Sequence, residues 1–363
     1  MVRSSLHDVL ATGVAEGASD WHIREDANVV LRVDGTLIEV DFTTTKDFLD
    51  QAIKEIADVS DLEDFRKTGD ADFAFEEEGV GRFRSNLHKQ RGKLGLTLRF
   101  VKGKVPSIAE LNLPGVLRKI SESNNGIVFV TGTTGSGKST TLAGMIDHMN
   151  TSLSQHIITI EDPIEYTFKD GTCIIEQREV GLDAETFESA LIHSLRQDPD
   201  VIVIGEMRNT ETFETALAAA ETGHLVLTTL HTKDAPQSIN RILDMYPNEE
   251  RDSIRNALST SLRAIICQRL VPKATGKGVV PVNEILLNTP IVRKLISENR
   301  LSKLSSAIEG GEEDGMVSFN KCLLKLVNDG VITEDVALEA SDNPQALKMN
   351  LKGIFLSDGG IIN

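Results

Sequence analysis

Short apolar runs separated by amphipathic stretches dominate the chain from Gly126 onward. The runs that predict buried strands are residues 127–131, 157–160, 201–204 and 225–230. Between them, apolar residues recur at the spacing of one helical face, as in the stretch from Phe213 to Ala220. This alternation indicates a parallel sheet with helices on its faces. Beyond Pro247 the pattern is mostly helical, so we expect C-terminal helices from about residue 250.

The first hundred residues follow a different pattern. Val30–Val33 and Thr36–Ile38 flank Asp34-Gly35, a dipeptide typical of tight hairpin turns. Residues 46–67 carry a polar helical pattern, and residues 72–100 predict further hairpins. We therefore expect a mixed α+β domain over residues 1–102, a linker over 103–112 and a second domain over 113–363.

A glycine-rich loop stands between the strand 127–131 and an amphipathic helix. Its sequence is Gly132-Thr133-Thr134-Gly135-Ser136-Gly137-Lys138-Ser139, a complete phosphate-binding pattern in the required strand–loop–helix context. Backbone N–H groups of such a loop surround the phosphates at the helix N-terminus. Lys138 is expected to reach the β- and γ-phosphates, and the Ser139 hydroxyl to bind Mg²⁺. The candidate residues for binding ATP or ADP are Thr133, Thr134, Gly135, Ser136, Gly137, Lys138, Ser139 and Thr140.

Acidic residues follow two of the predicted strands. Glu161 comes after the run 157–160, and Glu206 follows the run 201–204. Because ligands bind at the carboxyl ends of parallel strands, both carboxylates are expected beside the nucleotide. Glu206 is a candidate to orient the attacking water or to hold Mg²⁺ through water, and Glu161 is a rival for the role of general base. The alternative for each is an exposed loop carboxylate.

Two histidines and two arginines are further candidates in the second domain. His231 ends the strand 225–230 and is placed to sense a γ-phosphate, and His224, which opens the same strand, is a candidate to bind the nucleotide. Seven residues of strand separate the two histidines by about 23 Å, so they cannot share a metal ion. Arg196 and Arg208 lie on either side of the strand 201–204 as possible phosphate or interface residues. Hydrogen-bonded histidines and salt-bridged arginines are the alternatives.

Arg82 and Arg84 stand two residues apart on a predicted strand of the first domain. Their side chains therefore share one face, with Phe83 on the other. Paired arginines of this kind suit contact with a γ-phosphate bound to a neighbouring subunit. The alternative is a solvated or salt-bridged face.

The composition excludes several classes of protein. A net charge of −17 disfavours a nucleic-acid partner, because phosphate contacts need clustered Lys and Arg. The cysteines at positions 173, 267 and 322 are too few and too far apart for a four-cysteine metal site, and they indicate a reducing compartment. No apolar run approaches the length of a membrane span. We expect a cytoplasmic protein without direct membrane insertion.

Taken together, these motifs resemble those of the type IV pilus retraction ATPases, a branch of the secretion ATPase superfamily. The resemblance rests on residues 17–23, 81–86, 131–141, 158–165, 177–181, 198–200, 205–208, 219–224 and 229–232. It implies an α/β fold with a PAS-like N-terminal domain and a RecA-like P-loop ATPase domain with a helical C-terminal region. It also implies a homohexamer with nucleotide between the two domains, where neighbouring subunits complete each site.

The function implied by the resemblance is ATP-driven pilus retraction, the basis of twitching motility. The implied partner is the inner-membrane platform protein of the pilus machinery, which would recruit the motor to the membrane. Ile291–Glu298 follows the retraction motor's C-terminal signature only loosely, and Gly315–Phe319 is similar to an accessory retraction paralogue. That paralogue, a related assembly or secretion ATPase, a nucleotide-gated scaffold with negligible turnover and a DNA translocase are the alternatives.

Overall fold

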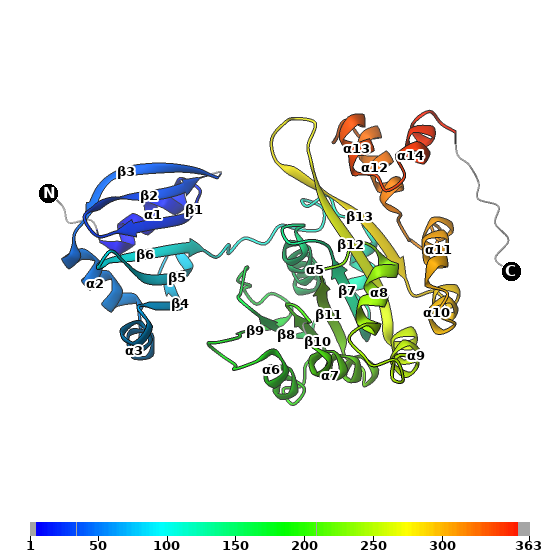
Figure 1. Ribbon diagram of the computed structural model, residues 1–363, viewed down its shortest axis with the longest axis horizontal. Coiled ribbons are helices and arrows are strands. Elements are labelled where there is room, and N and C mark those ends of the chain that lie inside the picture. Colours follow the sequence, from blue (N-terminus) through cyan, green and yellow to red (C-terminus); the bar gives the residue numbers. More distant parts are fainter. Residues whose placement is uncertain (1–4, 34, 208, 355–363) are drawn as a thin grey trace. The chain divides into compact units, whose positions relative to one another are not determined.

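The computed structural model describes residues 5–33, 35–207 and 209–354. The chain forms two compact units, each of which is described by itself (Figure 1). The first comprises the residues up to Lys104 together with Ile164–Phe168, and the second comprises the remainder. The sequence predicts that Ile164–Phe168 belongs to the second domain. It joins the first unit because Tyr166 forms a parallel bridge with Lys102.

The first unit is built on a six-stranded antiparallel sheet in the order β3-β2-β1-β6-β5-β4. The predicted hairpins are present, but the polar helical stretch forms two helices. The second begins at Asp58, whose side chain accepts the N–H of Asp61 while Asp61 caps the N–H of Asp58 in return. The elements are α1 (Leu6–Ala15), β1 (Ala18–Arg24), β2 (Ala27–Val33), β3 (Thr36–Thr44), α2 (Lys46–Ile56), α3 (Val59–Thr68), β4 (Asp70–Glu77), β5 (Gly81–Gln90) and β6 (Lys93–Phe100).

The core of the first unit lies on one face of this sheet. Trp21 and Phe83 are fully buried there, with their ring centroids 5.3 Å apart in an edge-to-face contact. Phe83 also stacks on Phe75 at 5.4 Å. Because side chains alternate along β5, the burial of Phe83 turns Arg82 and Arg84 to the opposite face, as predicted.

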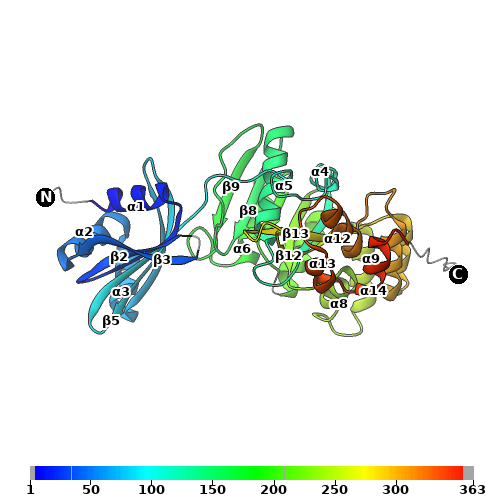
Figure 2. The same ribbon diagram turned by 90° about the horizontal axis from the view of Figure 1, so that it is seen from above.

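The second unit has a seven-stranded mixed sheet in the order β13-β12-β7-β11-β10-β8-β9 (Figures 1 and 2). All neighbouring strands are parallel except β12 and β13, which are antiparallel. The predicted α/β fold and all four predicted strands are confirmed. The strands are β7 (Gly126–Thr131), β8 (His156–Glu161), β9 (Ile174–Glu179), β10 (Val201–Ile204), β11 (Leu225–Leu230), β12 (Leu262–Pro272) and β13 (Val279–Leu287).

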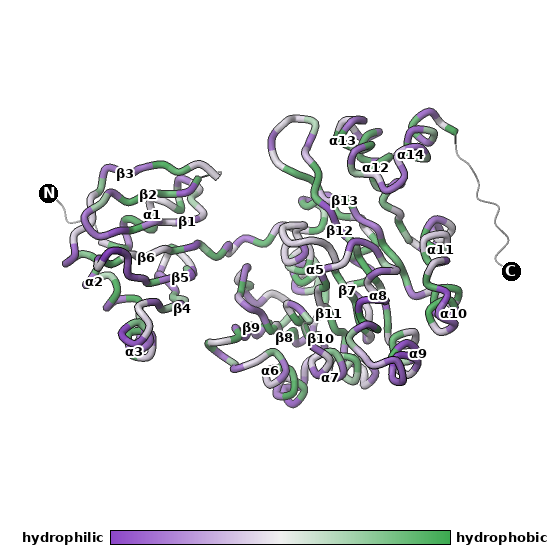
Figure 3. Tube along the Cα trace, in the orientation of Figure 1, coloured by the Kyte–Doolittle hydropathy of each residue, from purple (hydrophilic) through white to green (hydrophobic). Residues whose placement is uncertain are grey.

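Helices cover both faces of this sheet. Helices α6 to α9 share one core with Ile127 and Phe129 of β7, whereas α5 lies on the other face (Figure 2). Hydrophobic residues therefore run along the whole length of the central strands (Figure 3). The helices are α4 (Val116–Ser121), α5 (Lys138–Ser152), α6 (Phe187–Ser194), α7 (Thr210–Glu221), α8 (Ala235–Leu243), α9 (Arg251–Ser261), α10 (Pro290–Ser297), α11 (Leu304–Gly310), α12 (Phe319–Asn328), α13 (Glu334–Ala340) and α14 (Pro344–Leu351).

The prediction of a mostly helical region from about residue 250 is wrong for residues 262–287. Helix α9 ends at Ser261, and the chain continues directly into β12 and then β13. The run from Ala264 to Cys267 is apolar on both sides of the chain, a pattern that fits a buried strand as well as a helix. Parallel pairing of β12 with β7 decides for the strand. Within the described residues, no helix is both long enough and apolar enough to cross a bilayer.

Candidate functional site

The phosphate-binding loop follows the carboxyl end of β7. Strands β11 and β12 pair with β7 on its two sides. Gly132 has φ 153° and Gly137 has φ 85°, conformations that favour glycine. A Cβ on Gly132 would lie 2.5 Å from the carbonyl oxygen of Gln268, so only glycine allows this approach. Thr133, Thr134 and Gly135 are exposed at the crown of the loop.

Lys138 is the first residue of α5 and lies inside the loop. Its Nζ donates to the carbonyl oxygens of Gly132, at 2.9 Å, and Thr133, at 3.1 Å. The hydroxyl of Ser136 is buried and has no hydrogen-bond partner in the part of the chain that the structure describes. Ser139 and Thr140 are half-buried at the start of the helix. The loop thus holds an ammonium group and an unsatisfied hydroxyl where a phosphate would lie.

Sequence reasoning missed Gln268 of β12, which holds this loop in place. Its Nε2 donates to the carbonyl oxygen of Ser136 at 2.6 Å, and its Oε1 accepts from the Thr141 hydroxyl at 2.7 Å. Asn283 of β13 donates to the same Oε1 at 3.0 Å. Gln268 is only 3% exposed. The available signal is an amide directly after the apolar run Ala264–Cys267, and the expectation of a helix hides it.

The structure brings Glu206 and His231 together. Strands β10 and β11 are parallel neighbours, so both residues leave the sheet at the edge where the loop lies. The Nε2 of His231 is 3.6 Å from a carboxylate oxygen of Glu206, and Thr229 fixes the Gly205 carbonyl at 2.6 Å. The side chain of Glu206 is 23% exposed, which leaves it accessible to water.

Glu161 lies at the same edge, at the end of β8. Its carboxylate accepts hydrogen bonds from the hydroxyl of Thr159 at 2.7 Å and the amide of Gln177 at 3.1 Å. The two candidate carboxylates thus differ in the neighbours that contact them, a neutral hydroxyl and amide at Glu161 and a histidine at Glu206.

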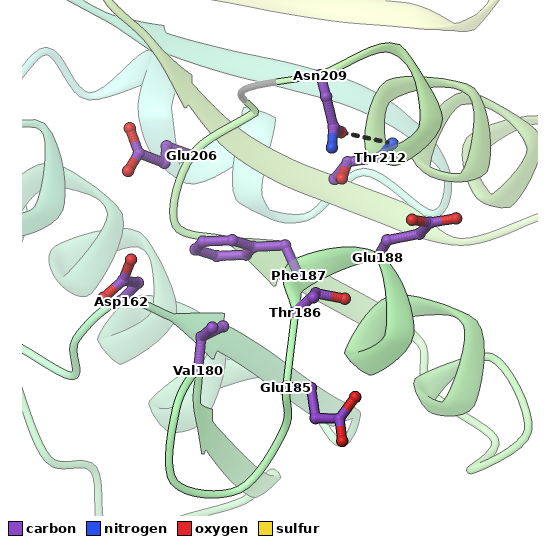
Figure 4. Close-up of a pocket in the computed structure, with 9 residues that line it drawn as sticks. All are labelled: Asp162, Val180, Glu185, Thr186, Phe187, Glu188, Glu206, Asn209 and Thr212. Carbon is purple, nitrogen blue, oxygen red and sulfur yellow. Dashed lines mark hydrogen bonds between the residues drawn. The ribbon is translucent and has the colours of Figure 1, made fainter.

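A pocket of about 260 Å³ opens beside Glu206 at this edge (Figure 4). Four carboxylates line it, and the N-terminus of α7 closes one side, where Asn209 accepts the Thr212 N–H at 3.0 Å. Four acidic groups repel a phosphate, so this pocket is unsuited to the nucleotide. The lining residues are Asp162, Val180, Glu185, Thr186, Phe187, Glu188, Glu206, Asn209 and Thr212.

Arg196 and His224 are placed at the opposite edge of the sheet. Arg196 precedes β10, and His224 precedes β11 and accepts the Gly126 N–H at the start of β7. A six-residue strand spans about 20 Å, so neither side chain reaches a nucleotide on this chain's own loop. The His224 ring bonds the Ala219 carbonyl at 2.9 Å, which is the hydrogen-bonded alternative. Arg208 lies outside the described residues.

Arg82 and Arg84 are half-buried and lie on the face of β5 opposite Phe83, in the first unit. Arg84 is directly opposite Arg99 of β6, and Arg99 pairs with the buried Asp20 at 2.7 Å. Among the described residues, Arg84 has no ion-pair partner. A salt-bridged face therefore does not account for Arg84.

Glu284 of β13 is a buried carboxyl group that contacts the turn between His231 and α8. It is 8% exposed and accepts the Ala235 N–H at 3.1 Å. Burial raises the pKa of Glu284 from the ordinary glutamate value of 4.5 to about 7. The folded chain therefore holds this proton at pH values where the unfolded chain has released it.

We expect Glu284 to make the folded state less stable as pH rises. Between about pH 5 and 7 the native state binds more protons than the unfolded state, so stability falls by up to about 1.4 kcal/mol per pH unit. The free energy of unfolding of wild type, measured relative to Glu284→Gln, should decrease through this window and level off above it. Parallel pH profiles for the two proteins would contradict the prediction.

Comparison with known proteins gives the family. The model of the family described as "Type II/IV secretion system protein" matches residues 1–299. The chain belongs to this family. The secretion-family chain is 41% identical to the "Type IV pilus retractation ATPase PilT" of Pseudomonas aeruginosa, over 94% of its own length and 99% of the relative's. It is 39% identical to the "Type IV pilus ATPase PilU" of the same organism, over 93% and 89% of the two chains.

A solved structure agrees with these relatives. The "Crystal Structure of the Pilus Retraction Motor PilT and Bound ADP" superimposes with a TM-score of 0.87 at 41% identity, covering 95% of this chain and 99% of the other. The predicted membership of the pilus retraction ATPases is confirmed, and the chain is an ATPase of that family.

Proposed function

We propose that this chain is a magnesium-dependent motor that assembles as a homohexamer, hydrolyses ATP and powers type IV pilus retraction, and hence twitching motility. The observation that carries the proposal is the similarity to PilT over almost its whole length, in sequence and in fold. The phosphate loop, Glu206 and His231, which lie at one edge of one sheet, support it from the side of the chemistry.

The two units fit the implied domain types. We assign the second unit as the RecA-like ATPase domain, because the loop-bearing strand β7 lies between β12 and β11 in a parallel core. We assign the first unit, with helices against an antiparallel sheet, as the PAS-like domain. C-terminal helices then begin at α10 rather than at about residue 250.

The loop residues Thr133 to Thr140 would hold ATP or ADP. Lys138 and the unsatisfied hydroxyl of Ser136 are both placed to meet phosphate oxygens. No group of three or more acidic, His or Cys side chains that could cage a metal occurs in the described residues. Mg²⁺ suits such a site, since it commonly takes one or two protein ligands and fills the rest with phosphate and water. Ser139 would bind it directly and Glu206 through water; the ion would neutralise charge that develops on the β- and γ-phosphates.

We assign Glu206 as the general base and Glu161 as a supporting residue. Glu206 is partly exposed and has a histidine 3.6 Å away, whereas two neutral donors hold Glu161. His231, at the end of β11, would contact the γ-phosphate side of the site. Removal of that phosphate then changes the surroundings of both His231 and Glu206, which links hydrolysis to movement.

Arg82 and Arg84 are proposed to act on a nucleotide bound by a neighbouring subunit. We expect the double Arg82, Arg84 alanine variant to lose at least about tenfold in turnover while each subunit stays folded and binds ATP. A salt-bridge role predicts a stability change below about 1 kcal/mol and normal turnover. Steady-state phosphate release, with thermal unfolding as the control, separates the two.

Mixed rings give a sharper test of the same idea. Arg84→Ala subunits mixed with Glu206→Gln subunits should recover part of the activity, because some interfaces then contain one intact copy of each group. If Arg84 acts only within its own subunit, the mixed rings would recover no ATPase activity. Arg196 is retained as an interface candidate, because it does not reach the chain's own loop. His224, predicted to bind the nucleotide, does not reach that loop either, and the role of Arg208 stays a prediction.

The motor would work in the cytoplasm on the inner-membrane platform protein of the pilus machinery. We propose no nucleic-acid partner, because a net charge of −17 disfavours phosphate contacts. DNA-stimulated turnover would support the translocase alternative instead. Negligible phosphate release by the assembled protein would support a nucleotide-gated scaffold.

A deletion strain tests the direction of the motor. Excess surface pili with no twitching are expected for a retraction motor, and bald cells would indicate an assembly ATPase. The second candidate is an accessory retraction paralogue, favoured by the 39% identity to PilU and by the C-terminal stretch Gly315–Phe319. It predicts normal twitching unless a second retraction ATPase is weakened.

A further inference from the structure

The β12–β13 hairpin touches two separate parts of the proposed site. Its residue pairs Cys267–Glu284 and Gln268–Asn283 are consecutive in the antiparallel register. Side chains of consecutive pairs point to opposite faces of a sheet. One pair therefore faces the phosphate loop and the other faces α8.

The pair Gln268–Asn283 fixes the phosphate loop. Gln268 bonds the Ser136 carbonyl on the loop and the Thr141 hydroxyl on α5, and Asn283 orients its amide. The amide has both of its ends engaged, so it holds the loop against the first turn of α5. Gln268 thus contacts the loop through the backbone carbonyl of Ser136.

The pair Cys267–Glu284 fixes the turn that carries His231. Glu284 accepts the N–H of Ala235, the first residue of α8, four residues after His231. The Thr232 hydroxyl bonds that of Ser238 at 2.7 Å and ties the same turn to α8. One short turn therefore connects Glu284 to Glu206, because His231 lies 3.6 Å from Glu206.

The chemistry of Glu284 goes beyond what packing requires. A carboxyl group that is 8% exposed is costly to bury, and a buried apolar residue would fill the same space at lower cost. What an apolar residue cannot do is accept the Ala235 N–H. The N–H groups at a helix start have no partner within the helix, so this one needs an acceptor from elsewhere.

We infer that Glu284 and Gln268 are positioning residues with separate effects on ATP hydrolysis. Glu284 holds the His231 turn in the arrangement needed for the chemical step, and Gln268 holds the phosphate loop in the arrangement needed to bind nucleotide. The inference rests on the proposed ATPase function. The pair Cys267–Glu284 would then affect the turnover rate, and the pair Gln268–Asn283 the affinity for nucleotide.

Steady-state kinetics of the assembled full-length chain tests this separation. Glu284→Leu should lower kcat at least about tenfold and leave the KM for ATP within about twofold. Glu284→Gln keeps an acceptor oxygen and should restore kcat to within about threefold of wild type. Gln268→Leu should raise KM at least about tenfold, with a smaller loss in kcat. Val280→Ala, which truncates a buried side chain on the same strand and face, is the control for packing and should lower only the melting temperature.

Three results would overturn the inference: a near-normal kcat for Glu284→Leu, equal losses for Glu284→Leu and Glu284→Gln, or parallel changes in kcat and KM for both positions. If Glu284→Leu does not fold, Glu284→Asp replaces it, because aspartate withdraws the carboxylate by one methylene group. This variant should lower kcat without raising KM, and a wild-type kcat would contradict the inference. Failure of the proposed function is distinct, because the wild-type chain itself would then show no hydrolysis.

Discussion

We expect Lys138→Ala to abolish ATP hydrolysis, with turnover at least about a thousandfold below wild type. Lys138 is 8% exposed and is held inside the loop by two backbone carbonyls, so its ammonium is fixed where the β- and γ-phosphates would lie. Alanine removes that charge, while the glycines of the loop keep the φ angles that set its shape. Steady-state phosphate release measures the effect.

Lys119→Ala is the matched control, because Lys119 is an exposed lysine in the same unit, on α4. It should leave turnover unchanged. A Lys138→Ala protein that keeps turnover within about tenfold of wild type would refute the assignment of the loop. Thermal unfolding of both variants shows whether a lost rate reflects a lost fold.

The second large effect is expected at Glu206. Glu206→Gln should still bind ATP but lose at least about a hundredfold in turnover, since the amide is nearly isosteric and cannot accept a proton. Nucleotide-binding titration and phosphate release, measured on the same preparation, separate the two properties. Glu161→Gln should lose less, because its neutral hydrogen-bond donors can bond an amide oxygen as well.

Glu185→Gln provides the control for charge. Glu185 is an exposed carboxylate that lines the same pocket as Glu206 (Figure 4), so its loss changes the local charge equally without touching the proposed base. It should keep near-normal turnover. A larger loss for Glu161→Gln than for Glu206→Gln would move the role of general base to Glu161.

The sequence by itself determined the parts of the protein that local interactions encode. The phosphate loop needs positive φ at its glycines. Glycine adopts such φ angles readily, so the sequence identifies these positions directly. The apolar runs of β7, β10 and β11 predict buried strands. Because side chains alternate between the two faces of a strand, the sequence also predicts that Arg82 and Arg84 share one face. The sequence could also predict that Glu206 and His231 lie close together, because neighbouring parallel strands end at the same edge of the sheet. The same rule places Arg196 and His224, which precede their strands, at the other edge.

Only the tertiary structure decided which distant segments meet. An apolar run such as Ala264–Cys267 has the same composition in a buried strand and in a buried helix, and its pairing with β7 settles the choice. The contacts of Gln268 with Ser136 and of Glu284 with Ala235 join residues that lie 132 and 49 positions apart. No periodicity encodes such distances, because the order of strands in a sheet depends on the packing of the whole unit. The sequence therefore names the groups that meet the nucleotide, and the packing of the sheet determines what holds them there.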